Sequence, residues 1–220
     1  MAGFVVLTVL LSVGYVLDEG RNQGSGHPKP VILYVNQGNG IVNGSGFGVM
    51  LSFASSHGFN TVFFQVYRQG ILMFSSTTLQ SFVTEAHGLN LSLFFALYII
   101  DSTHPLPASI YGLGEDGVSL DMSGLSGQSQ LSLLNTLKAS YDGITAVTTT
   151  DMGSTLKPDW LVLETYFPQT KSYINHGIIA SVGVFATNGQ EDYQSQYDNA
   201  LLNSDGVMVF DYYGLVTSGY

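Results

Sequence analysis

The sequence contains no cysteine and unusually few charged residues. Without cysteine, the chain has no disulfide bond, no thiolate nucleophile and no cysteine ligand for a metal. Charged residues make up 10% of the chain, against about 25% in an average soluble protein. The surface must therefore consist largely of uncharged polar groups, a composition shared by many extracellular and sugar-handling proteins.

Basic residues are the scarcest charged type. The chain has 6 Lys and Arg against 16 Asp and Glu, which gives a formal net charge of −10. Affinity for a phosphate backbone comes mainly from Lys and Arg, so we expect no binding to DNA or RNA.

Several familiar cofactor and catalytic motifs are also missing. The glycine-rich segment at residues 37–46, QGNGIVNGSG, lacks the lysine of a phosphate-binding loop and the spacing of a dinucleotide-binding motif. The histidines form no H-x-x-x-H or H-x-H pattern, and no G-x-S-x-G segment is present. We therefore expect no cofactor, no metal and no serine hydrolase of the usual type.

The first 17 residues form an uncharged apolar run. Its length is typical of the hydrophobic part of a secretory signal peptide and slightly short for a membrane span of about 20 residues. We predict a signal peptide or membrane anchor over residues 1–17, and hence an extracellular or outward-facing anchored protein. A buried first strand or helix is the alternative. Residues 18–30 are rich in Gly, Pro and polar side chains, which predicts a linker before one domain over residues 31–220.

A phrase of about 30 residues recurs along this domain. Each copy has a glycine, then a short apolar run, a polar loop and a helical segment, and the glycines lie 26 to 34 residues apart. A helix commonly ends on a left-handed residue, a conformation that glycine adopts without a steric penalty. We therefore predict repeated βα units. The glycines that open the copies are Gly58, Gly88, Gly117, Gly143, Gly177 and Gly206.

Eight apolar runs separated by helical segments predict a parallel sheet that is covered on its outer face. Eight is the number of strands at which such a sheet closes into a (β/α)8 TIM barrel. A doubly wound open sheet is the alternative. The chain stops soon after the eighth run, so the prediction includes a barrel that lacks its last helix. The predicted strands are residues 31–36, 61–67, 91–100, 118–121, 144–150, 160–166, 178–186 and 207–212.

The clearest amphipathic helix is predicted over residues 127–141, GQSQLSLLNTLKASY. Leu131, Leu134 and Leu137 are expected to face the core, because they recur at helical spacing. Gln130 and Lys138 are expected on other faces.

Acidic and aromatic side chains gather where the predicted strands end. In a barrel of this type the carboxyl ends of the strands form the functional face. Carboxylates and tyrosines around a concave rim suit glycosidic chemistry, in which one acid protonates the leaving oxygen, a second carboxylate acts as nucleophile or base, and flat rings stack on sugars. The catalytic candidates are Glu164, Asp211 and Asp121, and the substrate-binding candidates are Arg68, Gln65, Tyr67, Tyr98, Asp101, Asp151, Tyr166 and Tyr212.

Each candidate also has a purely structural interpretation. Asp101 and Asp151 precede polar turns, where an aspartate commonly caps a helix or closes a turn. Glutamate is a poor cap, so Glu164 at the end of the run WLVLE favours a role in a site. Arg68 is the only arginine after the linker, and its structural interpretation is a salt bridge with one of the acids.

The segment GFNTVFFQVYRQGILMFS, residues 58–75, resembles the second-strand region of glycoside-hydrolase-like TIM barrels. The FDYYG phrase around Asp211 is similar to the strand-end Asp-Tyr of such proteins. The resemblance implies a barrel that acts on polysaccharides through acidic residues. The chain has neither an Asn-Glu pair on the fourth strand nor a D-x-x-D-x-D-x-E run, so the resemblance assigns no catalytic pair.

The leading hypothesis is an exported or membrane-anchored barrel that binds a polysaccharide and hydrolyses it. Glu164 is the expected general acid, and Asp121 or Asp211 the nucleophile or base. A noncatalytic surface barrel that binds carbohydrate or protein is the alternative, and it predicts acids engaged as caps and ion pairs. An isomerase or lyase would need a phosphate site after the last two strands, where Gly189 and Gly214 are the notable glycines.

Overall fold

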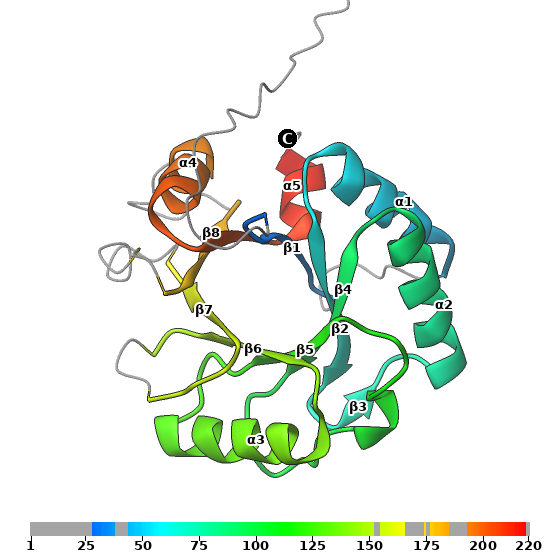
Figure 1. The fold of residues 1–220 in the computed structure, drawn as a ribbon, viewed down its shortest axis with the longest axis vertical. Helices are drawn as coiled ribbons and strands as arrows, with labels where there is room; N and C mark the ends of the chain where they lie inside the picture. The colour runs from blue at the N-terminus through cyan, green and yellow to red at the C-terminus, as the bar shows by residue number, and fades with distance from the viewer. Residues whose placement is uncertain are drawn as a thin grey trace, which may run out of the picture.

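The computed structural model describes residues 28–37, 44–151, 155–165, 174, 177–184 and 193–218. Eight parallel strands form a ring in the order β1-β9-β8-β7-β6-β5-β4-β2, and the pairing of β1 with β2 closes it. With helices outside the ring (Figure 1), this is the predicted (β/α)8 barrel and excludes the open sheet. The strands of the ring are β1 (Val31–Val35), β2 (Thr61–Arg68), β4 (Ser92–Tyr98), β5 (Gly117–Asp121), β6 (Ile144–Thr149), β7 (Trp160–Glu164), β8 (Ile179–Gly183) and β9 (Gly206–Phe210).

The helices cover the outside of the ring (Figure 1). Helix α4 packs on β8 and β9, and α5 packs on β1, next to the point where the barrel closes. In the part of the chain that the structure describes, no helix has both the length and the apolar character needed to cross a membrane. The helices are α1 (Gly44–Ser56), α2 (Ser76–Gly88), α3 (Gly127–Ser140), α4 (Tyr193–Asn203) and α5 (Tyr212–Ser218), with a 3-10 turn at Ala108–Ile110.

The predicted signal or anchor at residues 1–17, and Tyr166, lie outside the described residues. The described end of the predicted linker, residues 28–30, contacts the barrel. Lys29 Nζ donates hydrogen bonds to the carbonyls of Leu201 (3.1 Å) and Ser204 (2.8 Å). The Val207 N–H donates to the Pro30 carbonyl at 3.0 Å. The chain is therefore attached to the amino end of the barrel before β1 begins.

Two elements differ from the sequence prediction. A short strand β3 (Ile71–Leu72) pairs antiparallel with the end of β2, and the predicted loop there did not include it. The last strand ends at Phe210 and the short helix α5 follows at once, so the barrel does have a final helix. Asp211 Oδ1 accepts a hydrogen bond from the Gly214 N–H at 2.9 Å, which fixes the first turn of α5.

Helix α3 presents a different face to the core from the predicted one. Leu133, Leu134 and Leu137 are buried, as is Gln130, whereas Leu131 is 37% exposed. The buried set follows helical spacing with Gln130 as its first member. Burying this amide is tolerated because its nitrogen contacts the carbonyls of Met122 and Leu125 and the hydroxyl of Thr149.

The recurring glycines are explained by two different requirements. Gly58, after α1, has φ +79 and is the left-handed residue that the sequence predicts. Gly117 is instead the first residue of β5, and a Cβ there would lie 2.2 Å from the Phe94 ring. At this position glycine serves to admit an aromatic ring rather than to end a helix.

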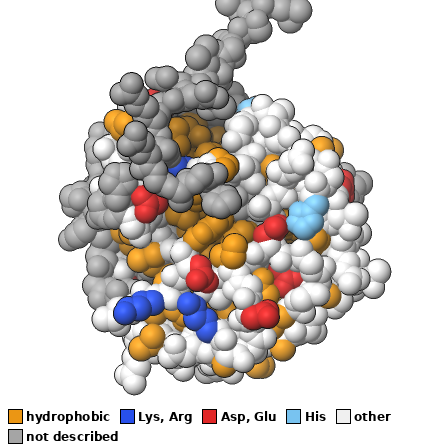
Figure 2. Space-filling view, in the orientation of Figure 1, with side chains coloured by type: hydrophobic (Ala, Val, Ile, Leu, Met, Phe, Trp, Pro, Cys, Tyr) orange, Lys and Arg blue, Asp and Glu red, His pale blue; other side chains and the backbone are white. Residues whose placement is uncertain are grey.

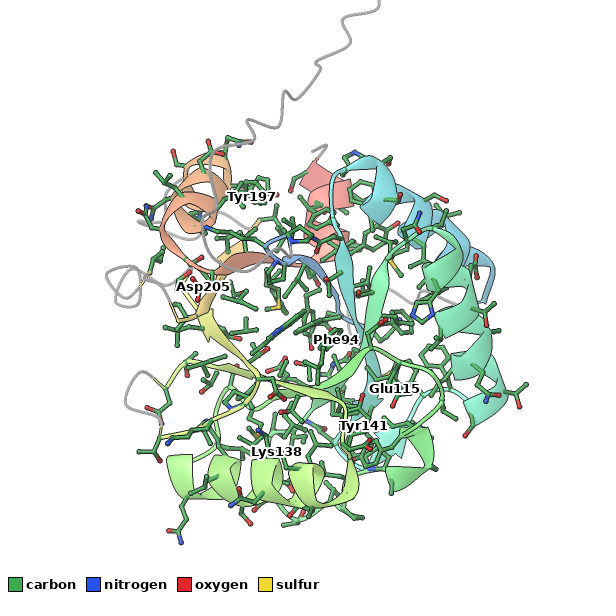
Figure 3. The ribbon with its side chains drawn as sticks, in the orientation of Figure 1. Phe94, Glu115, Lys138, Tyr141, Tyr197 and Asp205 are labelled. Atoms are coloured by element: carbon green, nitrogen blue, oxygen red, sulfur yellow. The ribbon has the colours of Figure 1, made fainter. Side chains whose placement is uncertain are left out.

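The barrel has an outer and an inner hydrophobic layer, because alternate strand residues point to opposite faces. The outer layer fills the space between strands and helices, and the inner layer fills the barrel itself. Inside, the Phe94 ring stacks on Phe63 (4.9 Å between centroids) and on Trp160 (4.7 Å). Figure 3 shows Phe94 within the ring of strands and Lys138 on α3 outside it. This aromatic layer fills the amino-terminal half of the barrel, so the remaining space lies toward the carboxyl ends.

One polar contact repeats four times at the amino end. The residue just before β2, β5, β7 or β9 accepts a hydrogen bond through its side-chain oxygen. The donor is a backbone N–H at the start of β1, β4, β6 or β8, respectively. These contacts join the eight strands of the ring into four pairs. The contacts are Val31 N to Asn60 Oδ1 (2.9 Å), Leu93 N to Asp116 Oδ2 (2.7 Å), Thr145 N to Asp159 Oδ2 (2.8 Å) and Gly177 N to Asp205 Oδ2 (2.8 Å).

Charged side chains are sparse on the surface. Figure 2 shows isolated acidic and basic side chains on the face in view, separated by uncharged polar and apolar groups. This distribution follows from the low charge content of the sequence.

Candidate active site

A pocket opens at the carboxyl ends of the strands. Its volume is about 230 Å³, below the roughly 300 to 1,000 Å³ of typical small-molecule sites. It therefore has room for about one sugar ring. Its described lining comes from six strands or the loops that directly follow them: Asn36, Gln65, Arg68, Tyr98, Asp121, Ser123, Glu164 and Phe210.

Asp121 ends β5 and is buried at the base of this pocket, with 4% of its surface exposed. Tyr34 on β1 donates its hydroxyl hydrogen to Asp121 Oδ2 at 2.9 Å. Burial raises the pKa of Asp121 above its ordinary value, and the hydrogen bonds from Tyr34 and Ser123 only partly oppose this effect. The pKa of Tyr34 is also raised, by burial first and then by the neighbouring Asp121. The Tyr34 hydroxyl therefore remains a proton donor to this carboxyl group.

Ser123 links the two acids of the pocket. Its Oγ lies 3.2 Å from Asp121 Oδ1 and 2.8 Å from Glu164 Oε1, at the end of β7. The two carboxyl oxygens are therefore no more than about 6 Å apart. Carboxyl groups of retaining glycosidases are separated by about 5 to 5.5 Å, and those of inverting enzymes by about 6.5 to 9.5 Å. The geometry is nearer the retaining arrangement.

Ser123 has one hydroxyl hydrogen and two acidic neighbours. Its Oγ lies within hydrogen-bonding distance of Asp121 and of Glu164, so the two carboxyls share this donor. The Tyr34 hydroxyl gives Asp121 a second donor. Burial nevertheless raises the pKa of Asp121, which favours its protonated form more than that of an exposed aspartate.

Three small hydroxyl side chains lie on the inner strand faces near the acids. Ser119 precedes Asp121 by two residues on β5, Thr148 is the register partner of Asp121, and Ser181 is the register partner of Glu164. Their oxygens are buried and have no hydrogen-bond partner among the described residues. The wall around the acids is therefore polar, which suits hydroxyl-bearing ligands or ordered water.

A bulge in β2 determines which side chains of that strand enter the barrel. The pairing of β2 with β4 shifts register between Gln65 and Tyr67, so Val66 and Tyr67 both pack in the outer layer. Arg68 then points inward, where Tyr67 would have pointed without the bulge. The Arg68 guanidinium carbon lies 5.0 Å from the centroid of the Tyr98 ring. The predicted substrate-binding Tyr67 does not line the pocket, and its hydroxyl donates to the Pro105 carbonyl at 2.9 Å.

Gln65 is buried beside the pocket, and its Oε1 accepts the Gln37 N–H at 2.9 Å. This contact ties the end of β1 to β2 across the seam where the barrel closes. Gln65, Arg68, Tyr98, Asp121 and Glu164 are thus the predicted residues that the structure brings together.

The other predicted residues lie elsewhere. Asp211 is occupied at the start of α5, and Tyr212 packs edge-on against Phe53 of α1 at 5.4 Å. Asp101 accepts hydrogen bonds from the Thr103 N–H and hydroxyl, which lower its pKa. The Asp151 N–H donates to Thr149 Oγ1 at 2.9 Å, and a Cβ on Gly127, the first residue of α3, would lie 3.3 Å from Asp151 Oδ2. The contacts of Asp101 match its interpretation as a turn residue.

Sequence reasoning missed Tyr34 and Ser123. Tyr34 is embedded in the apolar run VILYV, where a tyrosine resembles any other core residue. Ser123 could have been found, because it lies two residues after Asp121 and so shares its face of the strand. Within the described ranges, no group of three or more His, Cys, Asp or Glu could hold a metal ion.

No family model and no curated protein matches the sequence. Among solved structures, the barrel resembles an HpcH/HpaI aldolase from Desulfitobacterium hafniense DCB-2, with a TM-score of 0.55 and 7% identity over 87% of this chain and 89% of that one. It also resembles a xylanase-A-amylase inhibitor protein, XAIP-III, with a TM-score of 0.57 and 8% identity over 88% of this chain and 96% of the other. At such low identity these similarities concern the fold alone.

Proposed function

We propose that this protein is a barrel of glycoside hydrolase type, which binds one sugar unit of a polysaccharide in the pocket and cleaves its glycosidic bond. The observation that carries the proposal is the contact of Asp121 and Glu164 with the same Ser123 hydroxyl. Two neighbouring carboxyl groups, one acting as proton donor and one as nucleophile, are what a retaining mechanism requires.

The environments of the two acids suggest their roles. Burial raises the pKa of Asp121, which suits it to the role of acid, and we assign Glu164 as the nucleophile. This reverses the assignment expected from the sequence. Ser123 passes its hydrogen to the leaving oxygen and takes the proton of Asp121, while a Glu164 oxygen bonds to the anomeric carbon. Water then breaks this ester, and its proton returns through Ser123 to Asp121. Each step conserves protons, and the enzyme ends in its starting state.

Export or membrane anchoring through residues 1–17 belongs to this proposal, because polysaccharide substrates are commonly extracellular. The support is the apolar character of these residues and the low charge content of the whole chain.

A noncatalytic glycan-binding barrel is the second candidate. It is favoured by the position of Ser123, whose oxygen lies between the acids where a scissile bond would have to enter. The small volume of the pocket also fits binding of a single residue better than cleavage within a long chain.

The test is a screen of the full chain for release of reducing sugars from a panel of polysaccharides, with Glu164→Gln as the key variant. Loss of the nucleophile should lower the rate by about a thousandfold or more. Glu85→Gln makes the same chemical change on the exposed surface of α2 and should leave the rate unchanged. Activity that survives Glu164→Gln would remove this residue from the mechanism. Binding without any turnover would select the noncatalytic barrel.

A further inference from the structure

Arg68 is a cation that lines the pocket, and no acidic side chain of the described residues forms an ion pair with it. Among the described residues, its guanidinium forms no ion pair and donates no hydrogen bond, although Asp121 and Glu164 line the same pocket. The predicted salt bridge from Arg68 to a rim acid is therefore not found among the described residues.

Tyr98 holds the Arg68 guanidinium by a cation–π contact. The guanidinium carbon lies over the ring, 5.0 Å from its centroid. This contact uses the charge of the cation and none of its N–H donors. Those donors make no hydrogen bond to any described residue, so a molecule in the pocket can accept from them.

The charge of the pocket also favours an anionic ligand group. Arg68 is the one basic side chain in the described lining of the pocket. Burial raises the pKa of Asp121, which favours the neutral form of that acid and reduces the negative charge that an anionic group would meet. A carboxylate beside Arg68 would be paired with the guanidinium. A neutral sugar offers only hydroxyl oxygens, which use the hydrogen bonds of a guanidinium but not its charge.

We propose that the pocket recognises an acidic sugar, a hexuronate residue, whose carboxylate forms paired hydrogen bonds with the edge of the Arg68 guanidinium. This inference rests on the proposed function and specifies its substrate class. The carboxylate is planar, as the guanidinium is, so the two groups can meet in the bidentate geometry typical of arginine and carboxylate. The β2 bulge is the structural device that supplies this specificity, because it replaces an inward tyrosine by an inward arginine.

The experiment measures binding by calorimetry with the full chain. The probes are oligomers of galacturonic acid and of galactose, which differ at the sugar C5 substituent. The wild type should bind the uronate oligomer at least about tenfold more tightly than the neutral one. Arg68→Gln should abolish this preference, because it should lower the affinity for the uronate oligomer at least about tenfold more than the affinity for the neutral one. Arg68→Lys should retain part of the preference, because lysine keeps the positive charge but lacks the paired N–H donors of the guanidinium.

Lys138→Gln is the matched control, because it removes one positive charge from the exposed surface of α3 outside the barrel. It should leave the preference intact, and circular dichroism should show that all variants are folded. Equal affinity for both oligomers, or an unchanged preference in Arg68→Gln, would overturn the acidic-sugar inference and leave the proposed function standing. Absence of binding to any glycan would overturn both.

Discussion

The two ends of the barrel use acidic side chains in opposite ways. At the amino end, Asp116, Asp159 and Asp205 accept hydrogen bonds from backbone N–H groups at the starts of neighbouring strands. At the carboxyl end, Asp121 and Glu164 contact hydroxyl groups that carry exchangeable protons. Hydrogen bonds from Thr145 lower the pKa of Asp159, whereas burial raises the pKa of Asp121 and favours a proton on it. The same residue type thus maintains the barrel at one end and is prepared for proton transfer at the other.

The largest stability effect is expected at the aromatic layer of the amino-terminal half. Gly117→Ala places a Cβ against the Phe94 ring and should lower the free energy of unfolding by about 3 kcal/mol. Gly88→Ala is the control, because a Cβ there meets nothing within 4 Å and its expected change is under about 0.5 kcal/mol. Urea unfolding measures both. Equal effects would show that this half of the barrel is not tightly packed.

The next effect concerns the pH dependence of stability. Burial raises the pKa of Asp121, so the folded state holds its proton more tightly than the unfolded state. Its contribution is present below the ordinary pKa of 3.8 and is lost as pH rises through the raised pKa. Asp121→Asn mimics the protonated acid, so the variant should match the wild type at about pH 3 and exceed it in stability at about pH 8. Asp142→Asn, an exposed change, is the control.

Asp159 should show the opposite sign. Burial acts to raise its pKa, but the hydrogen bonds from Thr145 outweigh it and lower the pKa below 3.8. Its stabilising contribution is therefore present above that value and is lost as pH falls through the lowered pKa. Asp159→Asn should be destabilised by about 1 kcal/mol at neutral pH and should approach the wild type in acid. A shared direction of change in the Asp121 and Asp159 variants would remove the contrast between the two ends.

The smallest effect is expected from Ser123→Ala. Removing one partly exposed hydroxyl should change the free energy of unfolding by about 1 kcal/mol or less. The pKa of Asp121 should rise further, because a hydrogen bond that lowers it is lost. Carboxyl carbon NMR shifts across a pH titration would report this, with Ser132→Ala on the exposed face of α3 as control. An unchanged Asp121 titration would contradict the hydrogen bond from Ser123 to Asp121.

The fold was predictable because its signals are local and repeated. Each parallel strand is an apolar run of suitable length, and each repeat has a glycine near the strand start. The explanation of these glycines was only partly right, since Gly117 is required by a ring from another strand, a contact that sequence spacing does not reveal.

The site was harder to predict because it depends on small changes in register. Strict alternation along β2 places Tyr67 inside the barrel, and a bulge of one residue places Arg68 there instead. Asp211 ends an apolar run just as Glu164 does, but its side chain accepts a hydrogen bond from the Gly214 N–H at the start of α5. The polar residues after each apolar run correctly indicate the carboxyl end of the strand. The direction in which each side chain points depends on contacts with neighbouring strands, which the sequence does not show.

The closure of the ring has a consequence for how the protein is made. Strand β1 pairs with both β2 and β9, so one edge of β1 has no hydrogen-bonded neighbour until β9 joins the sheet. Phe210 on that last strand forms part of the pocket wall. A growing chain on the ribosome therefore has no complete pocket until β9 has emerged, and ligand capture reports that synthesis has passed this strand.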